Sequence, residues 1–265
     1  MREEEREMHL AFQSLFVGDE LKEEEKDEEE KNSKRVQDIR RIVGYEFKDP
    51  TILQQAFTHY SFEEGCSSLE RLAYIGDAIL TFAVTKDQCL LYPDFDPGRL
   101  TRLRAANVDT EKLARVALKY ELHDFLRHNI FLLGVQIDEF RDAIAKYPLH
   151  SSGLVDAPKV LADIVEALIG AIFLDCKCCL DTTWEVVKKL LEPIITPATL
   201  PIHPVTQLQE LCQSRRLSLK MRDSWKEDGV VEFLIDETCI GRAQYKAKRV
   251  IAKNRAALVA YNHIL

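Results

Sequence analysis

Two segments, ERLAYIGDAILTFAV (residues 70–84) and APKVLADIVEALIGAIFLD (157–175), decide how this chain folds. Both predict helices that are apolar on almost every face, which indicates burial inside a domain. Yet the first segment carries Asp77, and the second carries Asp163 and Glu166. An isolated buried carboxylate costs on the order of several kcal/mol unless it is paired or bound to a metal ion. These acids are therefore candidate functional residues.

The spacing of these acids places them where two helices can meet. Asp163 and Glu166 are three residues apart and share one helix face. Gly76, next to Asp77, and Gly170 allow the two helices to approach closely. If the helices pack together, several carboxylates converge on one small volume. Divalent cations with oxygen ligands relieve such repulsion, and magnesium is the usual one at phosphate chemistry.

Structural salt bridges are the alternative explanation for the same acids. Lys159 stands four residues before Asp163 and is a plausible partner for it. Arg71 is six residues from Asp77, which is a poor spacing for pairing, whereas Glu70 shares a helix face with Asp77. Spacing alone leaves the metal site and the salt bridges equally open.

The distribution of charge matters more than the net charge of −8 over 265 residues. Residues 1–31 hold 13 Asp and Glu against 5 Lys and Arg, whereas residues 201–265 hold 11 Lys and Arg against 7 Asp and Glu. The acidic run predicts a disordered tail or a frayed charged helix over residues 1–33. The basic end is compatible with a nucleic-acid partner.

The N-terminal residues, the hydropathy pattern and the cysteines indicate the cellular compartment. The beginning, MREEEREMHL, is too acidic for a signal or transit peptide. No stretch reaches the ~18 apolar residues that a membrane helix needs. We expect an intracellular protein of the nucleus or cytoplasm with no membrane partner. Its seven scattered cysteines argue against a disulfide framework, and CKCC (176–179) lacks the second ligand pair of a zinc site.

Hydrophobic periodicity predicts two domains after the tail. Apolar residues recur at helical spacing in three further segments, 36–47, 110–129 and 182–194. Three prolines in PATLPIHP (197–204) indicate a linker. A helix, strand-like segments and a last alanine-rich helix follow. The predicted boundaries are 34–195 for a helical domain, 196–203 for the linker and 204–265 for a second domain.

Several motifs in order resemble the ribonuclease III family. ERLAYIGDAIL resembles the family hallmark, and IVGYEFKDPTILQQAFTHYS (42–61) and LTRLRAANVDTEKLARVALKYELHDFLRHN (100–129) resemble the segments around it. The segment 157–175 resembles the second acidic motif in the form found in Dicer enzymes and plant ribonuclease-three-like proteins. The resemblance covers roughly residues 36–195. It implies a mainly α fold, with an all-helical nuclease domain that acts on double-stranded RNA as a homodimer.

The resemblance also assigns a site. The family's nuclease uses four carboxylates around Mg2+, with Mn2+ as a possible substitute, and Asp77, Asp163 and Glu166 match three of them. Asp77 and Glu166 are the residues expected to be catalytic. The implied reaction is hydrolysis of a phosphodiester by activated water, which leaves a 5′-phosphate.

One ligand position departs from the family pattern. The expected fourth carboxylate is Ala73 here, which removes a metal ligand and a negative charge. Glu70, one turn earlier, is a possible partial substitute. Lys159 matches a lysine that sits beside the acids in Dicer-type motifs. The resemblance gives His59 a structural role only.

The C-terminal segment resembles a double-stranded-RNA-binding domain with an α-β-β-β-α order. PVTQLQELCQ (204–213) fits its first helix and AKNRAALVAY (252–261) its last. Six residues are the RNA-binding candidates: Gln207, Glu210, Lys246, Lys248, Arg249 and Lys253. The cluster of basic residues suits phosphates across the major groove of A-form RNA, although a solvated helix face is the plainer alternative.

Two functions follow for the whole chain. The first is a magnesium-dependent double-stranded-RNA endonuclease that Ala73 makes crippled or inactive. The second is a pseudo-nuclease that dimerises and binds RNA without cutting it. A third, an interaction module, has only the acidic tail in its favour.

Overall fold

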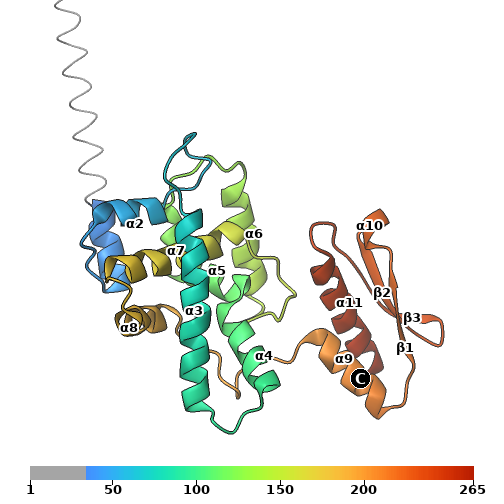
Figure 1. Cartoon of the computed structure of the whole chain (residues 1–265). Coiled ribbons are helices and arrows are strands. Elements are labelled where there is room, and N and C mark those ends of the chain that lie inside the picture. Colours follow the sequence, from blue (N-terminus) through green and yellow to red (C-terminus); the bar gives the residue numbers. More distant parts are fainter. Residues whose placement is uncertain (1–33) are drawn as a thin grey trace, which may run out of the picture.

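The computed structural model describes residues 34–265, which form two modules with separate hydrophobic cores (Figure 1). The tail predicted for residues 1–33 lies outside the described residues. The first module is built from helices, with one isolated bridge between Thr58 and Arg127. The second packs helices against a three-stranded sheet. The predicted fold class, mainly α with a small α-β-β-β-α unit, is confirmed.

The helical module begins with a helix at residues 34–43. Seven further α-helices and one 3₁₀ turn, η1, come after it. Their bounds are α2 (Pro50–Ala56), α3 (Glu70–Leu91), α4 (Pro97–Val108), α5 (Thr110–Lys119), η1 (Leu122–Phe125), α6 (Leu133–Ile144), α7 (Lys159–Asp175) and α8 (Leu180–Leu190). Aspartate side chains cap α2, α4 and α5 by accepting backbone N–H groups of the first turn. Such caps satisfy donors that a helix start leaves without partners.

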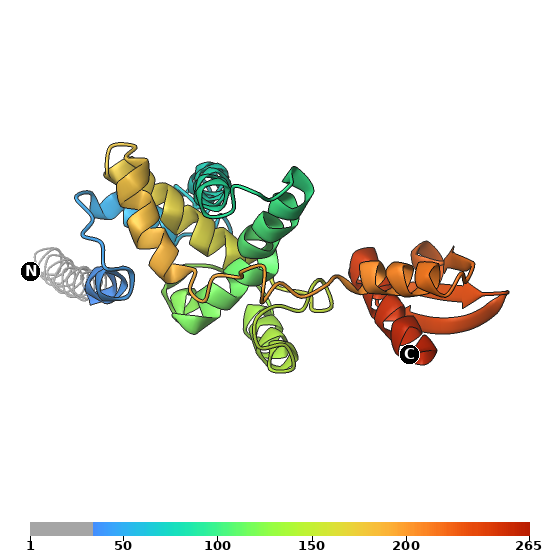
Figure 2. The same cartoon turned by 90° about the horizontal axis from the view of Figure 1, so that it is seen from below.

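Helix α7 is the centre of this module. Ten of its residues are buried, and it packs against α3, α5 and α2. Figure 1 shows α7 passing behind the long helix α3 and crossing it, and Figure 2 shows α3 and α7 adjacent when viewed from below. The two acid-bearing segments are therefore packed against each other, as the sequence indicated.

Glycines allow this crossing. A Cβ atom on Gly76 would lie 1.8 Å from the backbone oxygen of Glu166, and one on Gly170 would lie 2.2 Å from that of Leu72. Either contact is far too short for a side chain. The predicted close approach at Gly76 and Gly170 is confirmed.

The C-terminal module contains a mixed set of elements in the order helix, strand, short helix, two strands, helix. Their bounds are α9 (Pro204–Ser214), β1 (Leu219–Asp223), α10 (Trp225–Asp228), β2 (Val230–Ile235), β3 (Thr238–Gln244) and α11 (Arg249–Ile264). The sheet is antiparallel in the order β1-β2-β3. Helix α11 packs on β2, β3 and α9 through four fully buried alanines: Ala252, Ala256, Ala257 and Ala260.

Two segments differ from the predicted elements. The helical pattern over 110–129 ends as an α-helix at Lys119, because Glu121 adopts a left-handed backbone with φ of 53° and η1 follows. The region between β1 and β2 holds the short helix α10, which local periodicity did not reveal. No helix among residues 34–265 is long and apolar enough to cross a membrane.

Candidate functional site

The crossing of α3 and α7 determines where the acids lie. Gly76 contacts the backbone of Glu166, and the exposed Asp77 is close enough for its charge to act on the Glu166 carboxyl group. Asp163 lies one turn before Glu166 on α7. Burial, together with the negative charges of Asp163 and Asp77, raises the pKa of Glu166 to about 7. The structure therefore brings these three predicted site residues into one electrostatic cluster.

Lys159 is part of this cluster. Its Nζ lies 2.5 Å from Oδ1 of Asp163, one turn further along α7. Partial burial disfavours the ammonium ion, but the hydrogen bond and charge of Asp163 outweigh it and raise the pKa of Lys159. The salt bridge anticipated from their spacing is present, so Asp163 has a cationic partner within the chain.

Glu70 and His59 lie at the edge of the cluster. Burial lowers the pKa of His59, whereas the charges of Glu70 and Asp163 act in the opposite direction. His59 Nδ1 is 2.8 Å from Oγ of Ser61, which in turn accepts the backbone N–H of Asn129. These bonds join two loops and support a structural role for the histidine.

The carboxylates of Asp77, Asp163 and Glu166 are ligand types that suit a divalent cation. Three carboxylates provide hard oxygen ligands, and burial together with the charges of Asp163 and Asp77 raises the pKa of Glu166 despite the opposing charge of Lys159. Within residues 34–265, however, no three His, Cys, Asp or Glu side chains converge closely enough to form a ready-made metal site. Asp77, Asp163 and Glu166 would therefore need side-chain adjustment to hold an ion together.

Ala73 occupies the position where the resemblance places a fourth carboxylate. Its side chain is only 6% exposed and belongs to the core of the helical module. A carboxylate introduced there would be buried one turn before Asp77. The missing ligand is therefore replaced by apolar packing.

We expect Glu166→Gln to stabilise the chain at pH 8 but not at pH 4.5, when chelator removes divalent ions. The folded-state pKa of about 7 exceeds the ordinary 4.5, so the folded protein holds this proton more tightly. That contribution to stability is fully present below about pH 4.5 and is lost as pH rises through 7. The expected gain at pH 8 is about 1–2 kcal/mol after allowance for solvent screening. Chemical denaturation at both pH values measures it, and an equal effect at both would contradict the assignment.

Comparison with known proteins identifies the family. The ribonuclease III domain matches residues 70–177. Ribonuclease 3-like protein 3 of Oryza sativa is 46% identical over 231 residues, which cover 85% of this chain and 77% of that protein. The chain belongs to the ribonuclease III family. Endoribonuclease Dicer homolog 1 of Arabidopsis thaliana is 43% identical over 223 residues, although the match covers only 12% of its length.

One solved structure that matches part of the chain is also a ribonuclease III. The nuclease domain of ribonuclease III from Campylobacter jejuni is 28% identical, with a TM-score of 0.47 over 60% of this chain and 97% of that domain. In this chain, the segment that matches the family, residues 70–177, includes both acid-bearing helices, α3 and α7.

The candidate RNA-binding residues differ in their surroundings. Gln207 and Glu210 lie three residues apart on α9. Arg249 donates from Nε to Oδ2 of Asp223 at 2.6 Å, within the C-terminal module. Lys248 forms an ion pair with Asp156 of the helical module. Two remaining cations form no ion pair with the described residues: Lys246 and Lys253.

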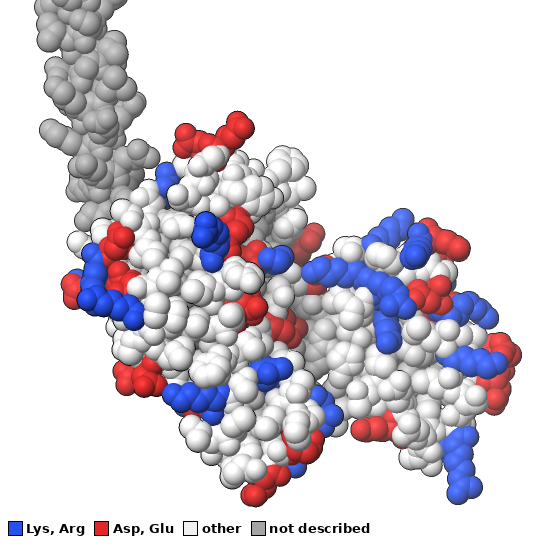
Figure 3. Space-filling model, in the orientation of Figure 1, with Lys and Arg blue, Asp and Glu red and all other residues white. Residues whose placement is uncertain are grey.

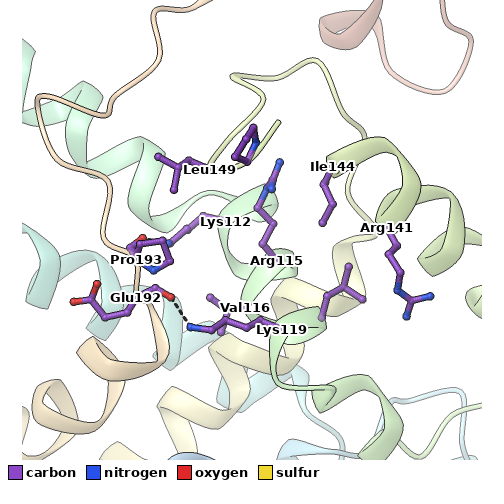
Figure 4. Close-up of a pocket in the computed structure, with 11 residues that line it drawn as sticks. Lys112, Arg115, Val116, Lys119, Arg141, Ile144, Leu149, Glu192 and Pro193 are labelled. Carbon is purple, nitrogen blue, oxygen red and sulfur yellow. Dashed lines mark hydrogen bonds between the residues drawn. The ribbon is translucent and has the colours of Figure 1, made fainter. Parts of the chain in front are cut away.

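A pocket between α5, α6 and the turn at Glu192 is rich in basic residues, which hydrogen-bond or ion-pair with groups of the helical module (Figure 4). Lys112 Nζ donates to the carbonyl of Pro193 at 2.6 Å, and Lys119 Nζ donates to that of Glu192 at 2.8 Å. Arg115 pairs with Glu111. Two of these bonds attach α5 to the segment that leads out of the helical module.

Sequence reasoning missed the loop of residues 150–156, which lies between the modules. His150 and Ser151 bind acids at the start of α5, and Asp156 binds Lys248. A small polar loop has no periodicity, and its partners are distant in sequence. The only local signal was the dense polar run HSSG next to the second acidic motif.

Proposed function

We propose that this chain is a double-stranded-RNA endonuclease of ribonuclease III type whose cleavage is crippled by Ala73. The observation that carries the proposal is the glycine-mediated crossing of α3 and α7, which clusters Asp77, Asp163 and Glu166. Family membership supports the reaction class. The substrate, the metal requirement and the 5′-phosphate product are parts of the proposal.

The residues of the cluster have distinct roles in this proposal. When bound, Mg2+ or Mn2+ supplies positive charge to the phosphodiester and makes water a stronger nucleophile. Asp77, Asp163 and Glu166 would hold the ion. Without an ion the pKa of Glu166 is about 7, and a bound divalent cation would lower it and favour the carboxylate that the ion needs as a ligand. Lys159 orients Asp163 and limits its freedom to turn towards another cation.

The C-terminal module is proposed to bind the duplex. Lys246 and Lys253 supply cations without ion-pair partners among residues 34–265, and α9 presents Gln207 and Glu210. Such a domain reads the shape and the 2′-hydroxyls of A-form RNA over about 16 base pairs. Binding is expected to weaken steeply with salt and to be weaker for a DNA duplex.

A non-catalytic RNA-binding protein is the second candidate. It is favoured by the buried Ala73 and by the lack of a ready-made metal site in the described residues. The deciding experiment incubates a long RNA duplex with the chain in Mg2+ or in chelator and analyses the product ends. Magnesium-dependent fragments with 5′-phosphates, however slow, support the enzyme. Duplex binding without any cleavage, even after Ala73→Glu, supports the second candidate.

Cutting both strands requires two sites, so we also propose a homodimer. Helix α3 exposes a stripe at helical spacing, with Tyr74 84% exposed and Phe82 53% exposed and Ala78 between them. Large exposed aromatic residues on one face are typical of an association surface. This face adjoins the acid cluster through Asp77.

We expect the chain to sediment as a dimer at micromolar concentration and the double variant Tyr74→Glu/Phe82→Glu to sediment as a monomer. Charges on that stripe would have to be buried without partners, which opposes association. Phe131→Glu is the matched control, because Phe131 is 85% exposed but lies outside α3. A monomeric parent chain, or a dimer that both variants leave unchanged, would contradict this interface.

A further inference from the structure

Four contacts join the C-terminal module to the loop of residues 150–156, which we call the docking loop. Lys248 Nζ lies 2.5 Å from Oδ1 of Asp156, and Tyr245 donates its hydroxyl to Oδ2 at 2.9 Å. The other two contacts are hydrogen bonds from side chains of α11 to backbone carbonyls: Asn254 Nδ2 to Gly153 and Arg255 Nε to Leu154, each 2.9 Å. In Figure 1, the start of α11 lies on the side of its module that faces the helical body.

The docking loop is held firmly by the helical module. His150 Nε2 lies 2.8 Å from a carboxylate oxygen of Asp109. The buried Ser151 donates its hydroxyl to Glu111 at 2.5 Å and accepts two backbone N–H groups of the loop itself. Three residues after Asp156 the chain enters α7 at Lys159, beside the acid cluster. The loop therefore presents a rigid surface rather than an adaptable one.

Shape complementarity accompanies these polar contacts. Gly153 has φ of +81°, and a Cβ atom there would lie 2.4 Å from Nδ2 of Asn254. The Asn254 side chain is buried, and its Oδ1 has no hydrogen-bond partner in the described part of the chain. The guanidinium of Arg255 also lies 4.6 Å from the ring centroid of Tyr245. Docking thus buries the Asn254 amide, which would be exposed to water again when the C-terminal module leaves the docking loop.

The carboxylate of Asp156 pairs with Lys248, a cation that a phosphate of bound RNA would otherwise contact. Asp156 is 19% exposed in its side chain and offers Lys248 the same kind of anionic oxygen as a phosphate. Lys248 lies between Lys246 and Lys253 in the basic segment. The charge of Lys253, together with burial, lowers the pKa of His203, so the start of α9 lies near this segment. The docked edge and the candidate RNA-binding residues therefore share Lys248. Figure 3 shows basic side chains on the C-terminal module where it meets the helical module.

We propose that the docking loop is an autoinhibitory contact, in which Asp156 competes with duplex RNA for Lys248. In the docked state this cation is unavailable. Binding of a duplex requires the C-terminal module to leave the loop, so apparent affinity is reduced by the fraction of molecules that remain docked. The inference rests on the proposed duplex binding, but it does not depend on whether the acid cluster cuts RNA.

The test measures binding of a 5′-labelled RNA duplex of about 20 base pairs to the full chain in Ca2+, which excludes turnover. Asp156→Asn should tighten binding on the order of three- to tenfold. Gly153→Ala should act in the same direction without a change of charge, because its Cβ displaces Asn254. Asp138→Asn is the matched control, since Asp138 forms an exposed ion pair with Arg141 outside the docking loop.

Amide hydrogen exchange provides a second readout. Adding the duplex to the parent chain should increase exchange in residues 150–156, because binding undocks the loop. Equal affinities for the parent chain, Asp156→Asn and Gly153→Ala would overturn the inference, as would an equal gain from Asp138→Asn. Unchanged exchange of the loop on RNA binding would also overturn it. If no form of the chain bound duplex RNA, the proposed function would fail with it, which is a distinct result.

Discussion

Replacing Ala73 by Glu is expected to raise the rate of magnesium-dependent duplex cleavage by about a hundredfold or more at low magnesium concentration. The change adds a carboxylate one turn before Asp77, on the helix that crosses α7 at Glu166. Groups that merely orient metal ligands are worth about 10–100-fold in affinity or activity, so a ligand should be worth at least as much. Water can fill an empty coordination position but cannot supply the missing charge.

The same substitution should lower stability when metal is absent. Ala73 is almost fully buried, and alanine favours helices slightly more than glutamate does. A new buried carboxylate near Asp77 and Glu166 adds desolvation and repulsion, with an expected cost of about 1–3 kcal/mol in chelator. Added magnesium should recover part of this loss in the variant and little in the parent chain.

Two titrations check this expectation on the parent chain and on Ala73→Glu: duplex cleavage against Mg2+, and duplex binding in Ca2+. Binding should barely change, because the candidate RNA-binding residues lie in the separate C-terminal module. If the parent chain cleaved as fast as the variant at low magnesium, the vacancy at Ala73 would be unimportant. Glu70 or a phosphate of the substrate would then have to complete the site.

The central helices could be predicted from the sequence because their patterns are unusual. Apolar residues on nearly every face predicted burial of both helices, and acids within such helices had to be explained by partners or ions. The prediction is confirmed for α7, but it is wrong for α3, which buries only seven of its 22 residues and leaves Asp77 exposed. The close helix contact at Gly76 and Gly170 could be predicted as well, because a glycine in an apolar helix indicates close approach of a neighbour. The salt bridge between Lys159 and Asp163 followed from spacing alone.

Contacts between the two modules could not be predicted in this way. The sequence predicts Lys248 as a phosphate-binding residue because it belongs to a basic run. Its partner in the structure, Asp156, lies in a loop 92 positions away. Only the folded arrangement decides which cations of such a run face solvent. The turn at Glu121 was missed for a related reason, since apolar spacing continues through it while the backbone leaves the helix.

Gly76→Ala is expected to destabilise the chain by about 3 kcal/mol or more. Overpacking of a core usually costs about 1–3 kcal/mol, because neighbouring side chains can rotate away. Here the new Cβ would meet the backbone oxygen of Glu166 at 1.8 Å, and backbone within a buried helix cannot rotate. Helices α3 and α7 would have to separate along the main contact of the helical module.

Separation of the helices would also disperse the acid cluster. Separation would expose the Glu166 carboxyl group to water and move Asp77 away from it, so the pKa of Glu166 should fall from about 7 towards its ordinary value. Chemical denaturation measures the lost stability, and its pH dependence between pH 4.5 and 8 measures the change in the pKa of Glu166. Gly134→Ala is the matched control, because a Cβ at this position of α6 meets nothing within 4 Å. Comparable destabilisation by both substitutions would show that the loss comes from glycine replacement in a helix rather than from the crossing that assembles the acids.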